Sequence, residues 1–289
     1  MTVNRVLFDP PGPRARRRIA ITTAVSVLVI AGLFALALRQ FDNHGQLAAD
    51  RWQPFTHWPY IHFLLQGVEG TLKATVTAAV ISFPLGALMA LLRISPNRAV
   101  RSIATVYVEL FRSIPLLLLI YAFLLALPTY GINLPIFFKL VVPIVLVNVA
   151  VLAEVFRAGI AAVDRGQFEA AAAIGLRYRQ VMRIVVLPQA IRIVVPALVT
   201  QLVSLLKDST LGYVVSYPEL MRKAENLTVY THLLVQTYLI VSVIYVLMNF
   251  ALGRLASVLE RRLNGRPRGK AVVADPAGPA ATRSAALLH

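Results

Sequence analysis

Residues 169–188 read EAAAAIGLRYRQVMRIVVLP, a charged and amphipathic stretch between two apolar runs of the chain. Its first part, taken with the two residues before it (QFEAAAA, 167–173), has high helix propensity. Gly175 can end that helix in a left-handed cap. From 177 to 187 the apolar residues recur at helical spacing, with arginines on the opposite face. The stretch therefore predicts two short helices joined by a turn, the second of which is stopped by Pro188.

The rest of the chain has the composition of a membrane protein. Its 289 residues are 58% hydrophobic and 15% charged, with a mean hydropathy of +0.70, whereas soluble domains carry about 25% charged residues. No alternation typical of barrel strands is present, which predicts an all-α membrane protein. The net charge of +16 does not indicate nucleic-acid binding, because the basic residues lie in the gaps between apolar runs. The chain has no cysteine and its five histidines are scattered, so we expect no metal site.

Six apolar runs approach the roughly 20 residues that cross a bilayer core of about 30 Å. We expect spans at about 19–38, 71–92, 103–127, 136–158, 190–207 and 232–259. The first is uncharged and no small-residue cleavage site follows it, which indicates a retained anchor and not a signal peptide. The remaining segments are an N-terminal tail (1–18), an outer loop (39–66), a membrane domain (67–262) and a C-terminal tail (263–289).

The distribution of lysine and arginine predicts the orientation. With the N-terminus in the cytoplasm, the inner segments hold 20 Lys and Arg residues and the outer segments hold 6. This is the bias of the positive-inside rule, and it places both termini in the cytoplasm. The opening stretch then lies at the cytoplasmic face. Amphipathicity alone fits an interfacial helix on acidic lipid as well as a docking element for a cytosolic partner.

The spacing within the stretch resembles the EAA loop of ATP-binding-cassette (ABC) importer permeases. That pattern is EAA, three residues, Gly, nine residues and Ile-x-Leu-Pro, and here Val185 stands in place of Ile. In that family the loop forms a coupling helix that sits in a groove of the ATPase subunit. The resemblance implies that 164–188 docks on a separate ATPase. The residues that match the pattern are Glu169, Ala170, Ala171, Gly175, Leu187 and Pro188.

The resemblance extends to polar amino-acid permeases over about 71–262. It is carried by ELFRSIPLLLL (109–119), AEVFRAGI (153–160) and SLLKDSTLGYVVSYPEL (204–220). NHGQLAADRW (43–52) and the N-terminal extension look like the actinobacterial glutamate permeases. The resemblance implies a type I importer permease, with one extra N-terminal helix before a five-helix core, in the bacterial inner membrane. Its favoured substrate is glutamate, with glutamine, a cationic or a neutral amino acid as alternatives.

A pump needs an energy source, and the chain contains no G-x-x-x-x-G-K-[ST] phosphate loop. We therefore expect no catalytic residue and no cofactor in this chain, with ATP and Mg²⁺ bound by a partner. The partners implied by the resemblance are an ATPase dimer, a second permease chain (a copy or a sister subunit) and an extracellular solute-binding protein. The competing class, a secondary transporter working alone, predicts repeated halves, and we find no convincing internal repeat.

Charges within the spans are candidate substrate contacts, because each costs about 2.5–3.5 kcal/mol to insert. Glu109 and Arg112, and Glu154 and Arg157, are three residues apart and can neutralise each other on one helix face. Both pairs fit helix packing or a gate as well as the substrate path. Lys207, Asp208 and Ser209 follow a short span and offer donors and acceptors to an amino acid, although a self-paired Lys–Asp cap is the alternative. Residues 211–231, including Pro218-Glu219-Leu220, are expected to form an outer surface for the binding protein.

Overall fold

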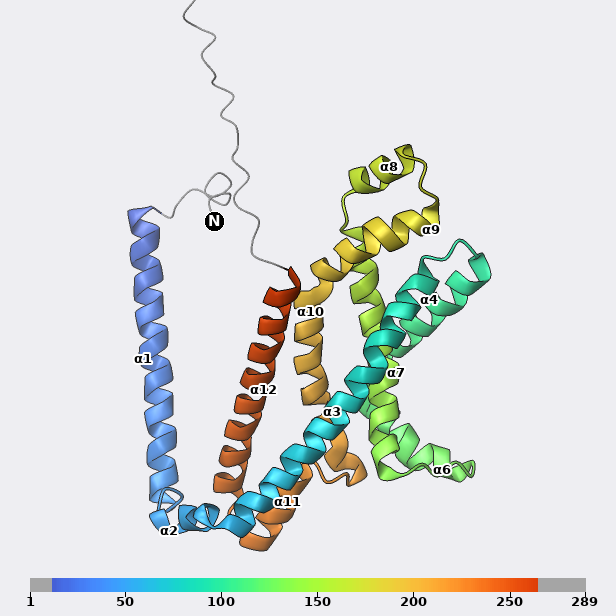
Figure 1. Cartoon of the computed structure of the whole chain (residues 1–289). Helices are drawn as coiled ribbons and strands as arrows, with labels where there is room; N and C mark the ends of the chain where they lie inside the picture. The colour runs from blue at the N-terminus through green and yellow to red at the C-terminus, as the bar shows by residue number, and fades with distance from the viewer. Residues whose placement is uncertain (1–11, 265–289) are drawn as a thin grey trace, which may run out of the picture. The chain divides into compact units, whose positions relative to one another are not determined.

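The computed structural model describes residues 12–264, and these contain helices and no strands (Figure 1). The predicted all-α fold is therefore confirmed. The tails expected at 1–18 and 263–289 lie largely outside the described residues. The elements are α1 (Pro13–Asn43), α2 (Ala49–Trp52), η2 (Gln53–Thr56), α3 (Trp58–Arg93), α4 (Arg98–Ser113), α5 (Leu116–Tyr121), the π-helix η3 (Ala122–Ala126), α6 (Leu127–Thr129), α7 (Ile136–Ala161), α8 (Arg165–Ala173), α9 (Tyr178–Gln180), the π-helix η4 (Val181–Val186), α10 (Leu187–Asp208), η5 (Ser209–Val215), α11 (Leu220–Thr231) and α12 (Leu234–Asn264).

Among the described residues, five helices are long and apolar enough to cross a membrane, and an interrupted pair raises the number to six. The interrupted pair is the expected third span, 103–127. It is not one helix, because α4 ends at Ser113 and α5 begins at Leu116. Pro115 lacks an N–H and disfavours helical geometry at the residue before it. The first span is longer than the expected 19–38, since α1 runs from Pro13 to Asn43.

The expected stop at Pro188 is wrong. The helical path that begins at Tyr178 continues through α10 without a break. The turn before the proline is a π-helix, Val181–Val186, whose wider turns pair residues five apart. A proline in a helix interior removes one hydrogen bond and crowds the carbonyl four residues earlier, and a local π segment relieves both problems. The arginine-rich segment is therefore a direct extension of a membrane helix.

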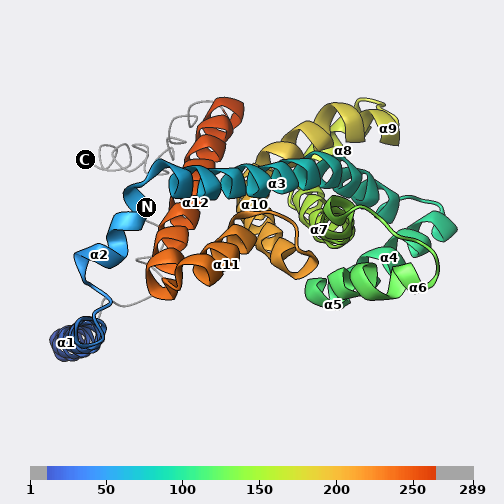
Figure 2. The same ribbon diagram turned by 90° about the horizontal axis from the view of Figure 1, so that it is seen from below.

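The described chain divides into two compact units. Of the described residues, unit 1 comprises those up to Val80, Ile114–Val145 and Leu205–Met248, and unit 2 comprises Ile81–Ser113, Leu146–Ser204 and those from Asn249 on. In unit 1, α11 packs against the first part of α3 and of α12 (Figures 1 and 2). The buried side chains of this cluster are Leu64, Leu220, Ala224, Leu227 and Val241. Helix α1 buries no residue, which suits a helix surrounded by lipid.

A close approach of backbones positions the loop before α11 in unit 1. A Cβ on Gly67 would lie 2.8 Å from the Leu220 Cα, and one on Gly70 would lie 2.5 Å from the Pro218 carbonyl oxygen. The hydroxyl of Tyr217 donates to the Gly70 carbonyl at 3.1 Å, and the Leu220 N–H donates to the Thr71 hydroxyl at 3.1 Å. Two glycines three residues apart thus give α3 a face on which this loop lies.

In unit 2, α4 packs against α7 through a small cluster. Val108, Ala150 and Ala153 are buried together, and the Tyr107 hydroxyl donates to the Leu146 carbonyl at 2.9 Å. The second part of α3 also contacts α7 closely, since a Cβ on Gly86 would lie 2.5 Å from the Leu152 Cβ. Small residues let membrane helices approach in this way, because van der Waals packing replaces the hydrophobic drive that lipid does not supply.

Replacing Gly70 and Gly253 by alanine should have opposite effects on stability. Alanine in a helix is normally favoured over glycine by about 0.5–1 kcal/mol, and a Cβ on Gly253 meets nothing within 4 Å. At Gly70 the added methyl overlaps the Pro218 carbonyl, and such overpacking costs about 1–3 kcal/mol. Thermal unfolding in detergent should show Gly70→Ala melting below the wild type and Gly253→Ala at or above it. Equal melting temperatures would contradict the close approach.

Candidate functional site

The EAA-like segment forms a short helix and a turn of defined geometry in unit 2. The Asp164 carboxylate accepts a hydrogen bond from the Gly166 N–H at 2.7 Å and caps the start of α8. At the other end Gly175 has a φ of +83°, so the left-handed cap predicted there is confirmed. The Gly175 N–H donates to the Ala172 carbonyl at 2.9 Å, and the Leu176 N–H donates to the Ala171 carbonyl at 3.3 Å. These two bonds define a Schellman turn, which satisfies carbonyls that the helix leaves unpaired.

We call residues 165–186, which comprise α8, this turn, α9 and η4, the arm. Figures 1 and 2 show α8 lying beside α9. Ala171, Val181 and Val186 are buried between them, and the side chains that complete this cluster are Ile160, Val163, Leu176, Met182 and Val185. Ala171 therefore acts inside the arm, as the small residue on which the returning helix packs. Glu169 and Ala170, the other residues of the EAA triplet, are exposed.

The tip of the arm presents apolar side chains. Ile174 is 78% exposed and Tyr178 is 51% exposed. The Phe168 ring meets the Tyr178 ring edge-on, with centroids 6.1 Å apart. An apolar tip with the Glu169 carboxylate beside it suits insertion into a groove of another protein.

The remaining residues of the EAA-like pattern lie at the base of the arm. Pro188 is exposed and Leu187 is half-buried. Leu187 lines a cavity of about 560 Å³ between the arm and the loop after α3. The arm side of this cavity includes Arg179, Met182 and Arg183.

Three arginines of unit 2 surround the carboxylate of Glu154. Both Arg93 and Arg157 pair with its carboxylate, and the Arg157 Nε lies 3.1 Å from Oε1. Arg112 adds a further electrostatic attraction. The expected Glu154–Arg157 pair is present, but Glu109 and Arg112 form no ion pair among the described residues. Sequence reasoning missed Arg93, because it lies 61 positions from Glu154 and only packing brings them together.

A second polar contact that the sequence did not indicate joins α7 and α10 in unit 2. The Gln201 amide donates to the Asn148 carbonyl oxygen, and Asn148 is 1% exposed. Amide pairs of this kind hold membrane helices together, because an unpaired amide in hydrocarbon is costly. In the sequence, the signal for this contact was that Asn148 and Gln201 are isolated polar residues within apolar runs.

The residues of the Lys207–Ser209 segment lie in unit 1 and point to different roles. Lys207 is exposed at the end of α10, whereas Asp208 is half-buried and has an interaction partner. Ser209 is fully buried. Its hydroxyl donates to the Leu206 carbonyl at 2.7 Å and accepts from the Thr75 hydroxyl at 3.3 Å. Ser209 is thus committed to packing in this structure, and Lys207 is the side chain of the three that is open to a ligand.

The expected outer surface 211–231 is only partly a surface. Glu219 and Leu220 are fully buried, so they are not presented to a partner as the sequence suggested. Glu219 caps α11 by accepting from Met221 N at 2.8 Å and Arg222 N at 2.7 Å, and it also accepts from the Tyr245 hydroxyl at 3.0 Å. It lies outside the membrane-spanning helices. Burial raises its pKa to about 7, against the opposing effect of these hydrogen bonds.

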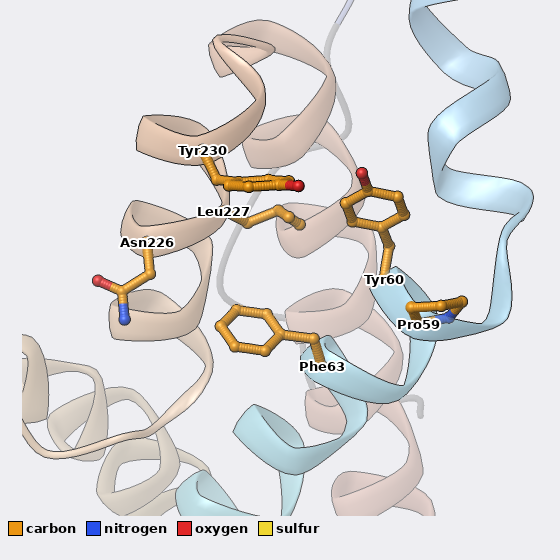
Figure 3. A pocket seen from close by; sticks show the side chains of 6 residues that line it. All are labelled: Pro59, Tyr60, Phe63, Asn226, Leu227 and Tyr230. Carbon is orange, nitrogen blue, oxygen red and sulfur yellow. The ribbon is translucent and has the colours of Figure 1, made fainter.

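An aromatic cavity of about 480 Å³ opens between the start of α3 and the end of α11 in unit 1. Figure 3 shows Tyr60 and Tyr230 facing each other across it, with Phe63 below them and Leu227 between. Val229 and Tyr230 are 70% and 76% exposed. One exposed part of 211–231 therefore lies at the end of α11, beside this cavity, and Tyr213, Ser216 and Pro218 are exposed in the loop before α11.

Comparison with protein families gives one clear match. Residues 82–265 match the family described as binding-protein-dependent transport system inner membrane component. A solved structure described as the crystal structure of an amino acid ABC transporter with histidines is 33% identical, with a TM-score of 0.69, and the match covers 73% of this chain and 98% of that one.

Curated relatives are similar over most of their length. The glutamate transport system permease protein GluD of Corynebacterium glutamicum is 36% identical over 243 residues, which is 82% of this chain and 89% of the relative. The probable glutamine ABC transporter permease protein GlnM of Bacillus subtilis is 37% identical, over 69% of this chain and 92% of its own. The arginine transport system permease protein ArtQ of Bacillus subtilis is 35% identical, over 71% and 94%.

The raised pKa of Glu219 predicts a pH-dependent stability. The folded protein holds this proton more tightly than the unfolded chain, so its contribution is fully present below about pH 4.5 and is lost as the pH rises through about 7. The change amounts to at most about 3 kcal/mol. In Glu219→Gln the side chain stays neutral, so the melting temperature should fall less between pH 5 and 8 than in the wild type. Asp164→Asn, at an exposed cap, serves as the control. Parallel curves for wild type and Glu219→Gln would contradict the assignment.

Proposed function

The chain belongs to the family of binding-protein-dependent transport system inner membrane components and is an amino-acid ABC permease of the bacterial inner membrane, and we propose that its substrate is glutamate and that its arm docks on a separate ATPase subunit. The family implies an ATPase and a solute-binding protein as partners. We infer that ATP and Mg²⁺ are bound by an ATPase dimer and that a second permease chain, a copy or a sister subunit, completes the pore.

The geometry of the arm is the observation that supports docking. Its tip carries exposed apolar side chains, and its base is held by a buried cluster and a Schellman turn. A docking element must keep its shape while it is pushed, because a compliant one would absorb the movement. The arm meets this requirement, since it leads without interruption into α10 and is reached directly from α7.

The coupling mechanism follows from this connection. A loaded binding protein docks outside, on the exposed end of α11, and ATP draws the two ATPase subunits together. Each arm then moves with its ATPase. Because the helical path from Tyr178 continues through α10, a displacement of the arm becomes a displacement of a membrane helix. Access to the substrate thereby alternates between the two sides of the membrane.

The extent of similarity supports glutamate over the alternatives. The match to the glutamate permease protein covers 82% of this chain, whereas the matches to the glutamine and arginine permease proteins cover 69% and 71%. The first match therefore extends beyond the common core. Lys207 is exposed at the end of α10 in unit 1, and Arg112 is exposed at the end of α4 in unit 2. A cation is the group that a side-chain carboxylate requires. Glu154 is paired with two arginines and is thereby less available to a cationic substrate.

Charge reversal at Glu169 should release the ATPase. Glu169 is exposed, so Glu169→Lys leaves the fold intact, and it removes any charge-assisted contact across the interface, worth about 1.5–3 kcal/mol. The tagged variant should recover at least about tenfold less ATPase from native membranes, with a parallel loss of uptake. Undiminished recovery would show that the arm is not the docking element.

The turn at Gly175 offers a matched test of arm geometry. Gly175 and Gly131 both have positive φ, at +83° and +79°, and a Cβ on either meets nothing within 4 Å. Alanine costs about 1–2 kcal/mol at each, because the left-handed conformation disfavours a side chain. Gly175→Ala should lower uptake severalfold and Gly131→Ala should not. Equal effects would assign the loss to general backbone strain.

Uptake by the complete transporter in proteoliposomes tests the substrate. Unlabelled glutamate should compete with labelled glutamate at least about tenfold better than glutamine or arginine. Lys207→Gln should weaken glutamate uptake by about tenfold, whereas Lys139→Gln in the same unit should not. Preferential uptake of glutamine or arginine would overturn the proposal that glutamate is the substrate, while the coupling proposal would stand.

A further inference from the structure

A strongly basic pocket lies in unit 2, apart from the arm tip. It has a volume of about 510 Å³ and is lined by Arg93, Arg98, Arg101, Ser102, Thr105, Val106 and Arg157. Four guanidinium groups thus face one cavity, and no lining residue is acidic. Clustered guanidinium groups repel one another unless an anion lies among them, so the pocket has the chemistry of an anion site.

The Glu154 carboxylate pairs with only two of the four arginines that line the pocket. Arg93 and Arg157 share the single carboxylate of Glu154. Arg101 donates to the Ser95 carbonyl at 3.1 Å, and the Arg98 side chain donates no hydrogen bond to residues 12–258, whose side chains the structure describes. A guanidinium group has five N–H donors. Several donors therefore remain for a ligand, and the excess of positive over negative charge in the cluster is three.

The pocket lies where the membrane helices of unit 2 reach one end. Arg93 is the last residue of α3 and Arg98 the first of α4. Arg157 is in the last two turns of α7, just before the chain enters the arm. The lysine and arginine distribution places this end at the cytoplasmic face. The headgroups of that leaflet include anionic phospholipids, and basic pockets between membrane helices bind such headgroups.

An apolar stripe on α4 continues from the pocket. Val106 lines the pocket, and Ile103 and Leu110 lie on the same face of the helix at helical spacing. The side chain of Ile103 is 72% exposed, that of Val106 is 60% exposed and that of Leu110 is 52% exposed. The polar stripe of α4, with Arg98, Arg101 and Ser102, runs beside them. A ligand that fits both features has a phosphate group attached to an acyl chain.

We propose that this pocket binds the phosphate group of an anionic phospholipid, with an acyl chain along the exposed stripe of α4. The phosphate oxygens accept from the guanidinium groups of Arg98 and Arg101, with the hydroxyls of Ser102 and Thr105 beside them. The lipid supplies the negative charge that Glu154 alone does not provide. The site is separate from the arm tip and shares Arg93 and Arg157 with the Glu154 ion pairs, and lipid binding there requires neither glutamate nor ATP.

Native mass spectrometry of the intact transporter in detergent, titrated with phosphatidylglycerol, tests the proposal. Arg98→Gln combined with Arg101→Gln should weaken binding of the tightest lipid at least about tenfold. Both side chains are exposed, so the variant folds. Arg17→Gln combined with Arg18→Gln, in the exposed start of α1, removes the same charge elsewhere and should change binding less than about twofold. Equal losses in both variants would show a general charge effect and would refute the site.

Two further experiments identify the molecule that occupies the pocket. Inorganic phosphate and deacylated glycerophosphoglycerol should compete at least about a hundredfold less well than phosphatidylglycerol, and equal competition would mean a free phosphate site. The chain has no cysteine, so Ser102→Cys introduces a single thiol. Efficient disulfide cross-linking between two copies that persists at every lipid concentration would mean that the pocket is an interface between permease chains. Either result overturns the lipid assignment and leaves the transport function untouched.

Discussion

Backbone hydrogen bonding inside hydrocarbon is the constraint on which the whole structure depends. A peptide group without a partner costs several kcal/mol in a bilayer, so the chain must satisfy its own N–H and C=O groups. This explains why most prolines inside the spans do not end the helix, with Pro115 as the exception. Pro84, Pro143 and Pro196 lie within continuous helices, and Pro188 is the second residue of α10, after the π-helix η4. The same accommodation joins the arm to α10, so the arm and this membrane helix form one continuous helical path.

The same low dielectric governs the charged side chains. In unit 2, the Glu154 carboxylate is held between Arg93 and Arg157, so this partly buried negative charge has two counter-charges. In unit 1, Glu219 is buried outside the spans and uses two backbone N–H groups and the Tyr245 hydroxyl. The first carboxylate is surrounded by cations and the second by neutral donors. Burial of the carboxyl group, only partly offset by these hydrogen bonds, raises the pKa of Glu219 to about 7.

In unit 2, the arginine cluster and the start of the arm both lie near the C-terminal end of α7. The last turns of α7 carry part of the arginine cluster and then lead into the arm. A phosphate bound at Arg98 and Arg101 of α4 would share the pocket with Arg157 of α7. The buried cluster of Val108, Ala150 and Ala153 holds the same two helices from within. In the proposed coupling, the arm would act next to a helix pair that these buried side chains hold together.

The sequence by itself determined the membrane class, the family and the local geometry of the arm, including the left-handed Gly175. These follow from hydropathy, from residue spacing and from a backbone conformation that favours glycine, all of which act over a few turns of chain. Only the tertiary structure decided that Arg93 joins Glu154, that Asn148 meets Gln201 and that Ser209 is turned inward. Those outcomes depend on which helix faces pack together, and one sequence does not specify the rotation of each helix in its span. Burial of Glu219 was missed for the same reason, since its loop is covered by a face of α3 that two distant glycines leave open.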